Sequence, residues 1–401
     1  MNQNKKICVI GLGYIGLPTA ALLANRGYDV HGVDVVESTV ETINRGEIHI
    51  VEPELDTFVQ SAVHSGKLKA SLIPKEADIF IIAVPTPFHE GYVPNIDYVI
   101  SATKAIVPYV KAGNIIILES TSPVGTTNKV EEVLKEEGID TSSLYIAHCP
   151  ERVLPGQIMR ELVENDRIVG GTTAQATIET VNFYKTFVSG EVLSTDAKTA
   201  EMAKLTENSF RDTNIAFANE LSILCDKFDI NVWELIALAN RHPRVNILQP
   251  GAGVGGHCIA VDPWFIVHAA KEENIDAKMI RSAREVNTYK TEWAIEKIKN
   301  AALKFENAHG RKAKIACMGL AFKPDIDDLR ESPALYITRQ LIAAGLDVLA
   351  VEPNISTHNE FKVIGYKEAL EEADIITFLV GHKEFKNLNI KSKLDFCGIL
   401  K

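Results

Sequence analysis

The sequence lacks several features that mark specialised classes of protein. Its 401 residues include six cysteines, and no two of them are spaced as C-x-x-C. This spacing argues against a zinc module or a disulfide scaffold and favours a reduced, cytoplasmic protein. No apolar run reaches the roughly 20 residues that a membrane span requires, and no targeting segment is expected, so no membrane partner is predicted.

Positive charge is also scarce. Asp and Glu total 53 and Lys and Arg total 42, which gives a formal net charge of −11. Because nucleic-acid binders present basic surfaces, no nucleic-acid partner is expected. An anionic small-molecule substrate stays compatible, since local arginines and lysines can outweigh the global charge.

The first half of the chain alternates apolar runs with helical patterns. Strands are predicted at residues 6–11, 77–85, 114–120 and 144–150, and a helix ending at Gly27 follows the first of them. This alternation predicts a parallel sheet covered by helices. The predicted fold class is α/β, with two Rossmann-like doubly wound parallel-sheet domains joined by a helical central region.

The opening pattern returns near the end of the chain, where KIACMGLAF (314–322) resembles KICVIGLGY (6–14). The residues between the two halves show helical spacing, above all 195–240, which contains almost no glycine or proline. We therefore expect three domains, at residues 1–194, 195–305 and 306–401. The last lacks the glycine fingerprint of the first, so a dinucleotide is not expected to bind there in the same way.

Gly11, Gly13 and Gly16 form G-x-G-x-x-G directly after the first predicted strand. Such glycines permit a tight turn and let a pyrophosphate approach the amide groups at a helix N-terminus. Asp34 ends another predicted strand, DVHGVD (29–34), which follows the helix that ends at Gly27. A carboxylate at this position accepts hydrogen bonds from a ribose hydroxyl and repels a 2′-phosphate. Strand, spacing, helix and acid agree, so the cofactor is predicted to be NAD rather than NADP.

Other residues of the first half are candidates for the same ligand. Tyr14 and Ile15 lie within the glycine turn and are expected to face the pyrophosphate. Thr86, Thr121 and Thr127 follow strands on the side where open sheets bind ligands. For Thr86 and Thr127, a turn or helix cap explains the residue as well as a ligand contact does.

A polar stripe marks the helical run TAEMAKLTENSFRD. Lys204, Asn208 and Arg211 occur at i, i+4 and i+7 and so share one face, which Glu201 extends by a turn. Charged helical residues usually form a solvated face. Two cations and an amide on the connector between two ligand-binding halves favour a face directed at a cleft.

The stretch PGAGVGGHCIAVDPW (250–264) surrounds Cys258 with four glycines. The default for a single cysteine is a buried structural residue. Adjacent His257 and Cys258 without a partner pair do not suit zinc, and no metal is expected. Glycines let a substrate carbon come close to the sulfur, and Asp262 is near enough in sequence to activate water, so Cys258 is predicted to be an exposed nucleophile.

Together these motifs resemble the UDP-glucose/UDP-mannose dehydrogenase family over most of the chain. The matching stretches are GLGYIGLP, VPTPF, ESTSPVG, CPERVLPG, EMAKLTENSFRD, RHPRVN, PGAGVGGHCIAVDP and GLAFKPDIDDLRESP. CPERVLPG and RHPRVNILQPG are most similar to the branch that acts on UDP-N-acetyl-D-mannosamine. The resemblance implies NAD-dependent, four-electron oxidation of a sugar C6 alcohol to a carboxylate, for bacterial surface polysaccharides, in a homodimeric enzyme.

The resemblance also implies roles for individual residues. Cys258 would form a thiohemiacetal and then a thioester, Lys204 and Asn208 would stabilise the oxyanion, and Asp262 would orient water. Glu151 would assist hydrolysis, although a structural role is equally open. The remaining residues that it assigns are the following. The UDP-sugar would contact Arg152, Val153, Lys204, Asn208, Arg211, His242, Arg244, Gly255, Phe322 and Lys323, and NAD would contact Arg330.

Two positions depart from the UDP-glucose dehydrogenases of this family. Pro155 stands where they carry a second glutamate, and Val261 stands where they carry a lysine. A glucose substrate is therefore disfavoured, and His242 and Arg244 are better suited to an N-acetyl sugar. The alternatives left open are UDP-N-acetylglucosamine or UDP-glucose as substrate and, more remotely, a non-catalytic NAD-sensing protein.

Overall fold

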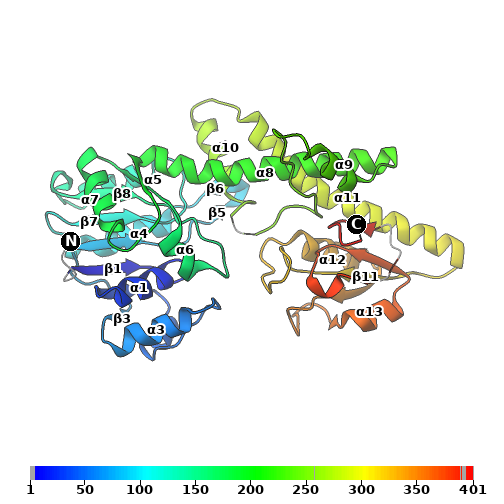
Figure 1. The fold of residues 1–401 in the computed structure, drawn as a ribbon, viewed down its shortest axis with the longest axis horizontal. Helices are drawn as coiled ribbons and strands as arrows, with labels where there is room; N and C mark the ends of the chain where they lie inside the picture. The colour runs from blue at the N-terminus through cyan, green and yellow to red at the C-terminus, as the bar shows by residue number, and fades with distance from the viewer. Residues whose placement is uncertain (1–4, 257, 389, 391–393, 401) are drawn as a thin grey trace. The chain divides into compact units, whose positions relative to one another are not determined.

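The computed structural model describes residues 5–256, 258–388, 390 and 394–400 (Figure 1). The chain divides into two compact units. The first contains Met1–Thr206 and His268–Glu273, and the second contains Glu207–Val267 and Asn274–Lys401. Among the described residues, no helix combines the length and the hydrophobicity that crossing a membrane requires.

The first unit is built on an eight-stranded sheet with the order β10-β9-β8-β7-β4-β1-β2-β3. Its strands are β1 (Lys6–Ile10), β2 (Asp29–Val33), β3 (Leu68–Ser71), β4 (Ile79–Ile82), β7 (Ile115–Leu118), β8 (Tyr145–His148), β9 (Arg167–Gly171) and β10 (Val192–Asp196). Its helices are α1 (Gly16–Asn25), α2 (Glu37–Asn44), α3 (Leu55–His64), α4 (Asp97–Ile106), α5 (Thr126–Glu136), α6 (Ile158–Glu164) and α7 (Ala174–Tyr184). A two-stranded antiparallel ribbon, β5 (Phe88–His89) with β6 (Val93–Pro94), projects between β4 and α4.

Alternate residues of β1 enter two different cores. Ile7 and Val9 pack in one hydrophobic cluster with α1, α3, α6 and α7, and Cys8 and Ile10 pack in another with α4 and α5. A strand buried on both faces must be apolar throughout, which is why KICVI carries no internal polar residue. The strand order reverses between β1 and β4, so the carboxyl end of β1 opens at the topological switch point where such sheets bind ligands.

The second unit joins helices to a five-stranded parallel sheet with the order β13-β12-β11-β14-β15. Its strands are β11 (Lys314–Met318), β12 (Asp347–Val351), β13 (Val363–Ile364), β14 (Ile375–Phe378) and β15 (Leu394–Asp395). Its helices are α9 (Val232–Ala239), α11 (Lys278–His309), α12 (Pro333–Ala343) and α13 (Tyr366–Glu372). Helices α8 (Ala197–Phe228) and α10 (Asp262–Glu272) have residues in both units.

The fold class predicted from the sequence is confirmed, and the structure refines it at two places. Strands β8 and β9 pair antiparallel, so the first sheet is mixed rather than wholly parallel. The continuous helical run expected at 195–240 is two helices, because Asp229 takes a left-handed φ of 58° after α8. The side chain of Asn231 then caps α9 by accepting the Trp233 and Glu234 amide hydrogens.

Candidate active site

The glycine turn joins β1 to α1 in the way that the fingerprint predicts. Gly11 has a φ of 90°, and a Cβ there would lie 2.5 Å from the carbonyl oxygen of Ala83, so only glycine fits. A Cβ on Gly16 would collide with the carbonyl of Gly11. A Cβ on Gly13 would meet no atom within 4 Å, so protein packing does not require this glycine, and the predicted approach of a pyrophosphate stays the reason expected for it.

The carboxylate of Asp34 lies beside this turn. One of its oxygens accepts the Leu12 amide hydrogen at 3.0 Å, and the other accepts the Val36 amide hydrogen at 3.0 Å. Asp34 is half-buried, so it fixes the turn and also presents an acceptor at its edge. Tyr14 is 43% exposed and Ile15 is half-buried, and both remain candidates for the same ligand.

The threonines of the first unit have internal partners. The Thr86 hydroxyl donates to the carbonyl oxygen of Thr121 at 2.5 Å, linking the two loops that follow β4 and β7. Thr127 is fully buried, and its hydroxyl and amide both donate to Glu201. The carboxylate of Glu201 therefore caps α5 and is buried, rather than extending the polar face of α8 as the sequence suggested. NAD contact by these threonines stays a prediction.

Two distant parts of the sequence meet at Asn208 and Asp262. Asn208 is buried on α8, and its side-chain amide donates to a carboxylate oxygen of Asp262 at 2.5 Å. Asp262 is the first residue of α10 and is 3% exposed. Its amide hydrogen in turn bonds the carbonyl oxygen of Cys258 at 2.8 Å, so one turn of chain holds the cysteine next to the acid. Cys258 is half-buried, and its neighbour His257 lies outside the described residues.

The glycines before Cys258 have a packing reason that the sequence did not reveal. A Cβ on Gly256 would lie 2.8 Å from the Phe322 ring, and one on Gly255 would collide with the carbonyl oxygen of Glu331. A Cβ on Gly253 would collide with the Thr291 hydroxyl. The loop therefore needs glycine in order to lie against α11 and the loop after β11. Our interpretation that the glycines only clear space for a substrate was incomplete.

Glu151 follows β8 and is almost fully buried. Its carboxylate pairs with Arg167 at 2.5 Å and accepts the Arg152 amide hydrogen at 2.7 Å. Both oxygens are thus occupied within the first unit, as the structural alternative for Glu151 would have it. Arg167 was not singled out from the sequence, and no local pattern distinguishes it from a surface arginine.

The other predicted substrate residues divide by exposure. Arg211, His242, Arg244 and Lys323 are exposed, and Lys204 and Phe322 are half-buried. Val153 packs against the core of the first unit, which favours a structural role for it. The exposed guanidinium of Arg330 forms an ion pair with Asp328 at 2.6 Å, and its expected contact with NAD stays a prediction.

Comparison with known proteins assigns the chain. In chain order, residues 5–188 match the NAD binding domain of the UDP-glucose/GDP-mannose dehydrogenase family, 198–289 its central domain and 316–397 its UDP binding domain. The chain belongs to this family. It is an oxidoreductase that uses NAD. The family predicted from the sequence is confirmed, and its name is corrected from UDP-mannose to GDP-mannose.

Individual relatives cover nearly the whole chain. A UDP-N-acetyl-D-mannosamine dehydrogenase of Campylobacter jejuni is 57% identical, over 99% of this chain and 100% of its own length. An NDP-N-acetyl-D-galactosaminuronic acid dehydrogenase of Ralstonia solanacearum is 52% identical, over 96% and 92%. The structure of a UDP-D-ManNAc dehydrogenase from Pyrococcus horikoshii is 40% identical, with a TM-score of 0.89, over 99% of this chain and 96% of that one.

The UDP binding domain of this dehydrogenase repeats the architecture of the NAD binding domain with different chemistry. Glu352 follows β12 as Asp34 follows β2. It accepts the Leu320 and Ala321 amide hydrogens at 2.8 and 2.9 Å, and His382 lies 3.0 Å from the same carboxylate. Both residues are buried. Burial raises the pKa of Glu352, but the hydrogen bonds from His382 and from the Leu320 and Ala321 amides together outweigh it and lower the pKa to about 2. Both acids therefore accept amide hydrogens of the loop beside them, but Glu352 is buried whereas Asp34 is half-buried.

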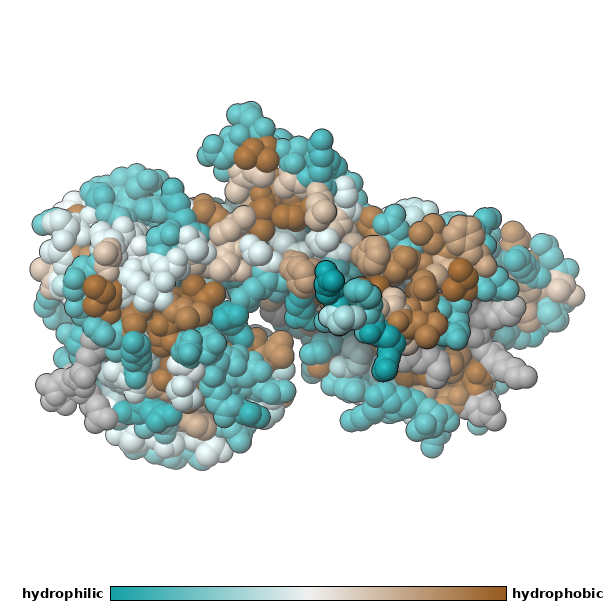
Figure 2. Space-filling view, turned by 45° about the horizontal axis from the view of Figure 1, so that its top comes forward, coloured by the Kyte–Doolittle hydropathy of each residue, from teal (hydrophilic) through white to brown (hydrophobic). Residues whose placement is uncertain are grey.

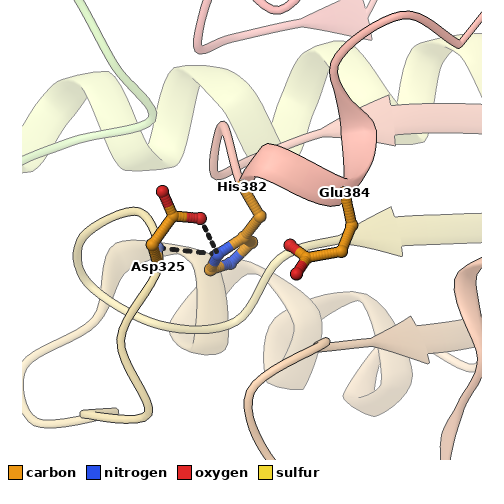
Figure 3. Close-up of side chains that lie close together, drawn as sticks. All are labelled: Asp325, His382 and Glu384. Atoms are coloured by element: carbon orange, nitrogen blue, oxygen red, sulfur yellow. Dashed lines mark hydrogen bonds and ion pairs between the residues drawn. The ribbon is translucent and has the colours of Figure 1, made fainter.

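His382 belongs to a group that has the composition of a metal site, with Asp325 and Glu384 (Figure 3). Its Nδ1 accepts the Asp325 amide hydrogen at 3.0 Å, and its Nε2 faces Glu352. Both ring nitrogens of His382 thus have protein partners, and its bond with Asp325 braces the loop after β11, which carries Phe322 and Lys323.

Proposed function

We propose that this dehydrogenase oxidises the C6 alcohol of UDP-N-acetyl-D-mannosamine to the carboxylate, giving UDP-N-acetyl-D-mannosaminuronate. The observation that carries the proposal is the 57% identity with the Campylobacter jejuni enzyme over both full lengths. The Asn208–Asp262 pair beside Cys258 supports the chemistry. We further propose three functional domains, at 1–194 for NAD, 195–305 for the catalytic lysine and cysteine, and 306–401 for the UDP-sugar.

The chemistry requires more than hydride removal. NAD, when bound, accepts a hydride from the carbon being oxidised, and Gly11, Gly13, Gly16 and Asp34 are the residues that would hold it. The first oxidation gives an aldehyde, which has no second hydride to lose readily. The Cys258 thiolate adds to the aldehyde carbon and forms a thiohemiacetal, which supplies the second hydride. The resulting thioester is cleaved by water, which releases the carboxylate and restores the thiol.

The proposed roles of the polar residues follow from where charge develops. Asn208 donates to the oxyanion of the thiohemiacetal and of the hydrolytic intermediate, and Lys204 adds a positive charge and moves a proton. Asp262 orients the attacking water. Its hydrogen bond with Asn208 fixes the amide so that its second N–H is directed by geometry rather than by free rotation.

The nearest rival substrates differ in the sugar alone. The Ralstonia solanacearum relative, 52% identical, favours a galactosamine derivative as the second candidate. UDP-N-acetylglucosamine and UDP-glucose remain further alternatives, and a non-catalytic NAD sensor is the remote one. We propose a cytoplasmic location, consistent with six cysteines that form no disulfide among the described residues, and a role in surface polysaccharide synthesis.

The deciding experiment is NADH production by the purified protein with a panel of nucleotide sugars. The panel contains UDP-linked N-acetylmannosamine, N-acetylgalactosamine, N-acetylglucosamine and glucose. We expect the highest kcat/KM with UDP-N-acetylmannosamine and two NADH per sugar at completion. Formation of one NADH per sugar with accumulating aldehyde would exclude the covalent route. If no sugar gave NADH, the non-catalytic NAD sensor would be the hypothesis that remains.

We also propose a homodimer formed through α8. Phe210, Phe217, Leu224 and Phe228 are 46% to 68% exposed, and their spacing of seven, seven and four residues places them on one face of the helix. Hydrophobic patches of this kind interrupt the hydrophilic surface in Figure 2. An apolar stripe on a charged helix is typical of a surface that another protein covers.

A further inference from the structure

The segment that leads into the cysteine loop has no regular secondary structure, yet its backbone is closely held. Residues 246–252 form neither helix nor strand. Side chains from α8, α11 and the residue that follows α9 nevertheless bond six of their backbone N–H and C=O groups. Irregular chain normally leaves these groups to water, so the amount of side-chain bonding is unusual for a connecting segment.

Two asparagines make paired contacts with this segment. Asn240 donates to the carbonyl oxygen of Ile247 at 3.0 Å and accepts the amide hydrogen of the same residue at 2.8 Å. Asn214 donates to the carbonyl oxygen of Asn246 and accepts the amide hydrogen of Leu248, both at 2.9 Å. A side-chain amide carries a donor and an acceptor side by side, so each asparagine bonds the backbone as a neighbouring strand would.

Two further side chains hold the start of the glycine loop. The side-chain oxygen of Asn219 accepts the Gly251 amide hydrogen at 2.9 Å, and the Thr291 hydroxyl donates to the carbonyl oxygen of Ala252 at 3.0 Å. Asn219 is fully buried and is itself fixed, because its amide donates to Asn287 at 2.8 Å. These contacts end six residues before Cys258.

We infer that Asn214, Asn219, Asn240 and Thr291 are positioning residues for the nucleophile. We call this set the backbone clamp. It fixes the path of the chain from Asn246 to Ala252. The clamp thereby sets the point from which the chain continues to Cys258, relative to Asn208 on α8. The inference rests on the proposed function only in taking Cys258 as the nucleophile. The clamp residues act through the backbone, and the loop conformation is the quantity that they control.

The test uses Asn214→Asp and Asn240→Asp in the full-length protein. Aspartate keeps the size and the acceptor of asparagine but removes the donor and sets a carboxylate against a backbone carbonyl. Both positions are half-buried, so the substitutions are compatible with folding. Asn231→Asp is the matched control. The Asn231 side chain accepts the Trp233 and Glu234 amide hydrogens at the cap of α9, and aspartate can do the same.

We expect amide hydrogen exchange in peptides covering 246–258 to quicken by about tenfold in both clamp variants, while the rest of α8 and α9 keeps its protection. The kcat should fall about 10- to 100-fold with the KM for NAD unchanged, because the nucleophile is misplaced and the NAD turn is not. Asn231→Asp should match the unaltered protein in both measurements.

A second pair of variants, at Thr291, tests the inference in case the aspartate variants do not fold. Thr291→Val removes the hydroxyl at nearly constant shape, and Thr291→Ser keeps it, so only the valine variant should show faster exchange and lower kcat. Unchanged exchange at 246–258 in the clamp variants, or the same effects in Asn231→Asp, would overturn the inference. Hydrogen exchange needs no substrate. It would therefore still test the backbone clamp if the protein oxidised none of the sugars and the proposed function failed.

Discussion

Asn208 and Asp262 share a hydrogen bond of 2.5 Å although they lie 54 positions apart in the sequence. Asn208 belongs to α8, whereas Asp262 begins α10 one turn after Cys258. Both side chains are at least nine-tenths buried, so the contact is protected from water. The pair therefore fixes the cysteine loop to the helix that carries the polar stripe, and each partner depends on the other for its orientation.

Replacing Asn208 by aspartate should disrupt this pair more than loss of a single hydrogen bond would. Two buried carboxylates would then lie in contact, so the pKa of one of them would rise and its ionised form would be disfavoured. We expect kcat at pH 8 to fall about 100-fold or more and to recover partly below pH 6, where the pair holds a proton. The pH profile of kcat, measured with the melting temperature, checks this. A uniform loss at every pH would contradict the charge explanation.

Cys258→Ser should separate the two halves of the reaction. An oxygen nucleophile can still add to the aldehyde, but an ester is a poorer acyl donor to water than a thioester is. Turnover should collapse while folding and NAD binding persist, and intact-mass spectrometry should find sugar-bearing protein. Near-normal turnover would exclude covalent catalysis by Cys258.

Cys8→Ser is the control for that substitution. Cys8 is fully buried in the core around β1, where burial raises the pKa of its thiol to about 11. A serine there should lower the free energy of unfolding by about 1–3 kcal/mol, because its hydroxyl is buried, and the folded fraction should keep its activity.

Asp34→Asn should weaken discrimination between NAD and NADP. The substitution removes the negative charge that disfavours a 2′-phosphate but keeps an oxygen to accept an amide hydrogen from the turn. We expect the Kd for NAD to rise about tenfold, so that the ratio of the Kd for NADP to the Kd for NAD becomes smaller. Titration with both coenzymes measures this, and equal use of the two by the unaltered protein would sink the assignment.

Glu119 predicts a pH effect on stability. Burial raises its pKa to about 7, the charge of Glu151 adds to the rise, and Arg167 and Tyr184 oppose it. Between the ordinary value of 4.5 and about 7, the folded state therefore holds a proton that the unfolded state has lost. The free energy of unfolding should fall as pH rises through this window, by at most about 3 kcal/mol.

Glu119→Gln tests that prediction, since glutamine resembles the protonated acid at every pH. It should raise the melting temperature at pH 8 relative to the unaltered protein and leave a smaller difference at pH 5. The exposed Glu191→Gln serves as control and should move neither value. A melting temperature of the Glu119 variant that follows the unaltered protein at both pH values would refute the assignment.

Phe217→Glu should produce monomers. Phe217 lies near the middle of the exposed apolar face of α8 and is 52% exposed, so the charge costs little in an isolated chain but opposes burial against a second copy. Sedimentation velocity should show a dimer for the unaltered protein and a monomer for the variant. A glutamate at Phe217 that leaves the sedimentation coefficient unchanged would place the contact elsewhere.

Local patterns were sufficient for the central strands of the first sheet and for the glycine turn, but β3, β9 and β10 were not predicted. Strands buried on both faces must be continuously apolar, so runs such as IFII and IIIL could be assigned directly. The break after α8 could not be predicted. Asp229 adopts a left-handed conformation there, which aspartate takes more readily than most residues, but the helical spacing of residues 195–240 gives no signal for it. Asn208 and Asp262 were each predicted, but their contact was not, and neither was the packing of Gly256 on Phe322. Those depend on tertiary structure.

The inward use of Glu352 has a consequence for the order of events in a four-electron oxidation. Glu352 is buried, whereas Asp34 is half-buried, so in the described part of the C-terminal sheet the acid after β12 does not present an acceptor to a second ribose as Asp34 can. Among the described residues, the glycine turn with a half-buried acid beside it occurs in the first sheet, so under the proposed mechanism the first NADH would depart and a fresh NAD would arrive there while the sugar is only half oxidised. The sulfur link at Cys258 would then act as a tether that keeps a reactive aldehyde from diffusing away during the exchange.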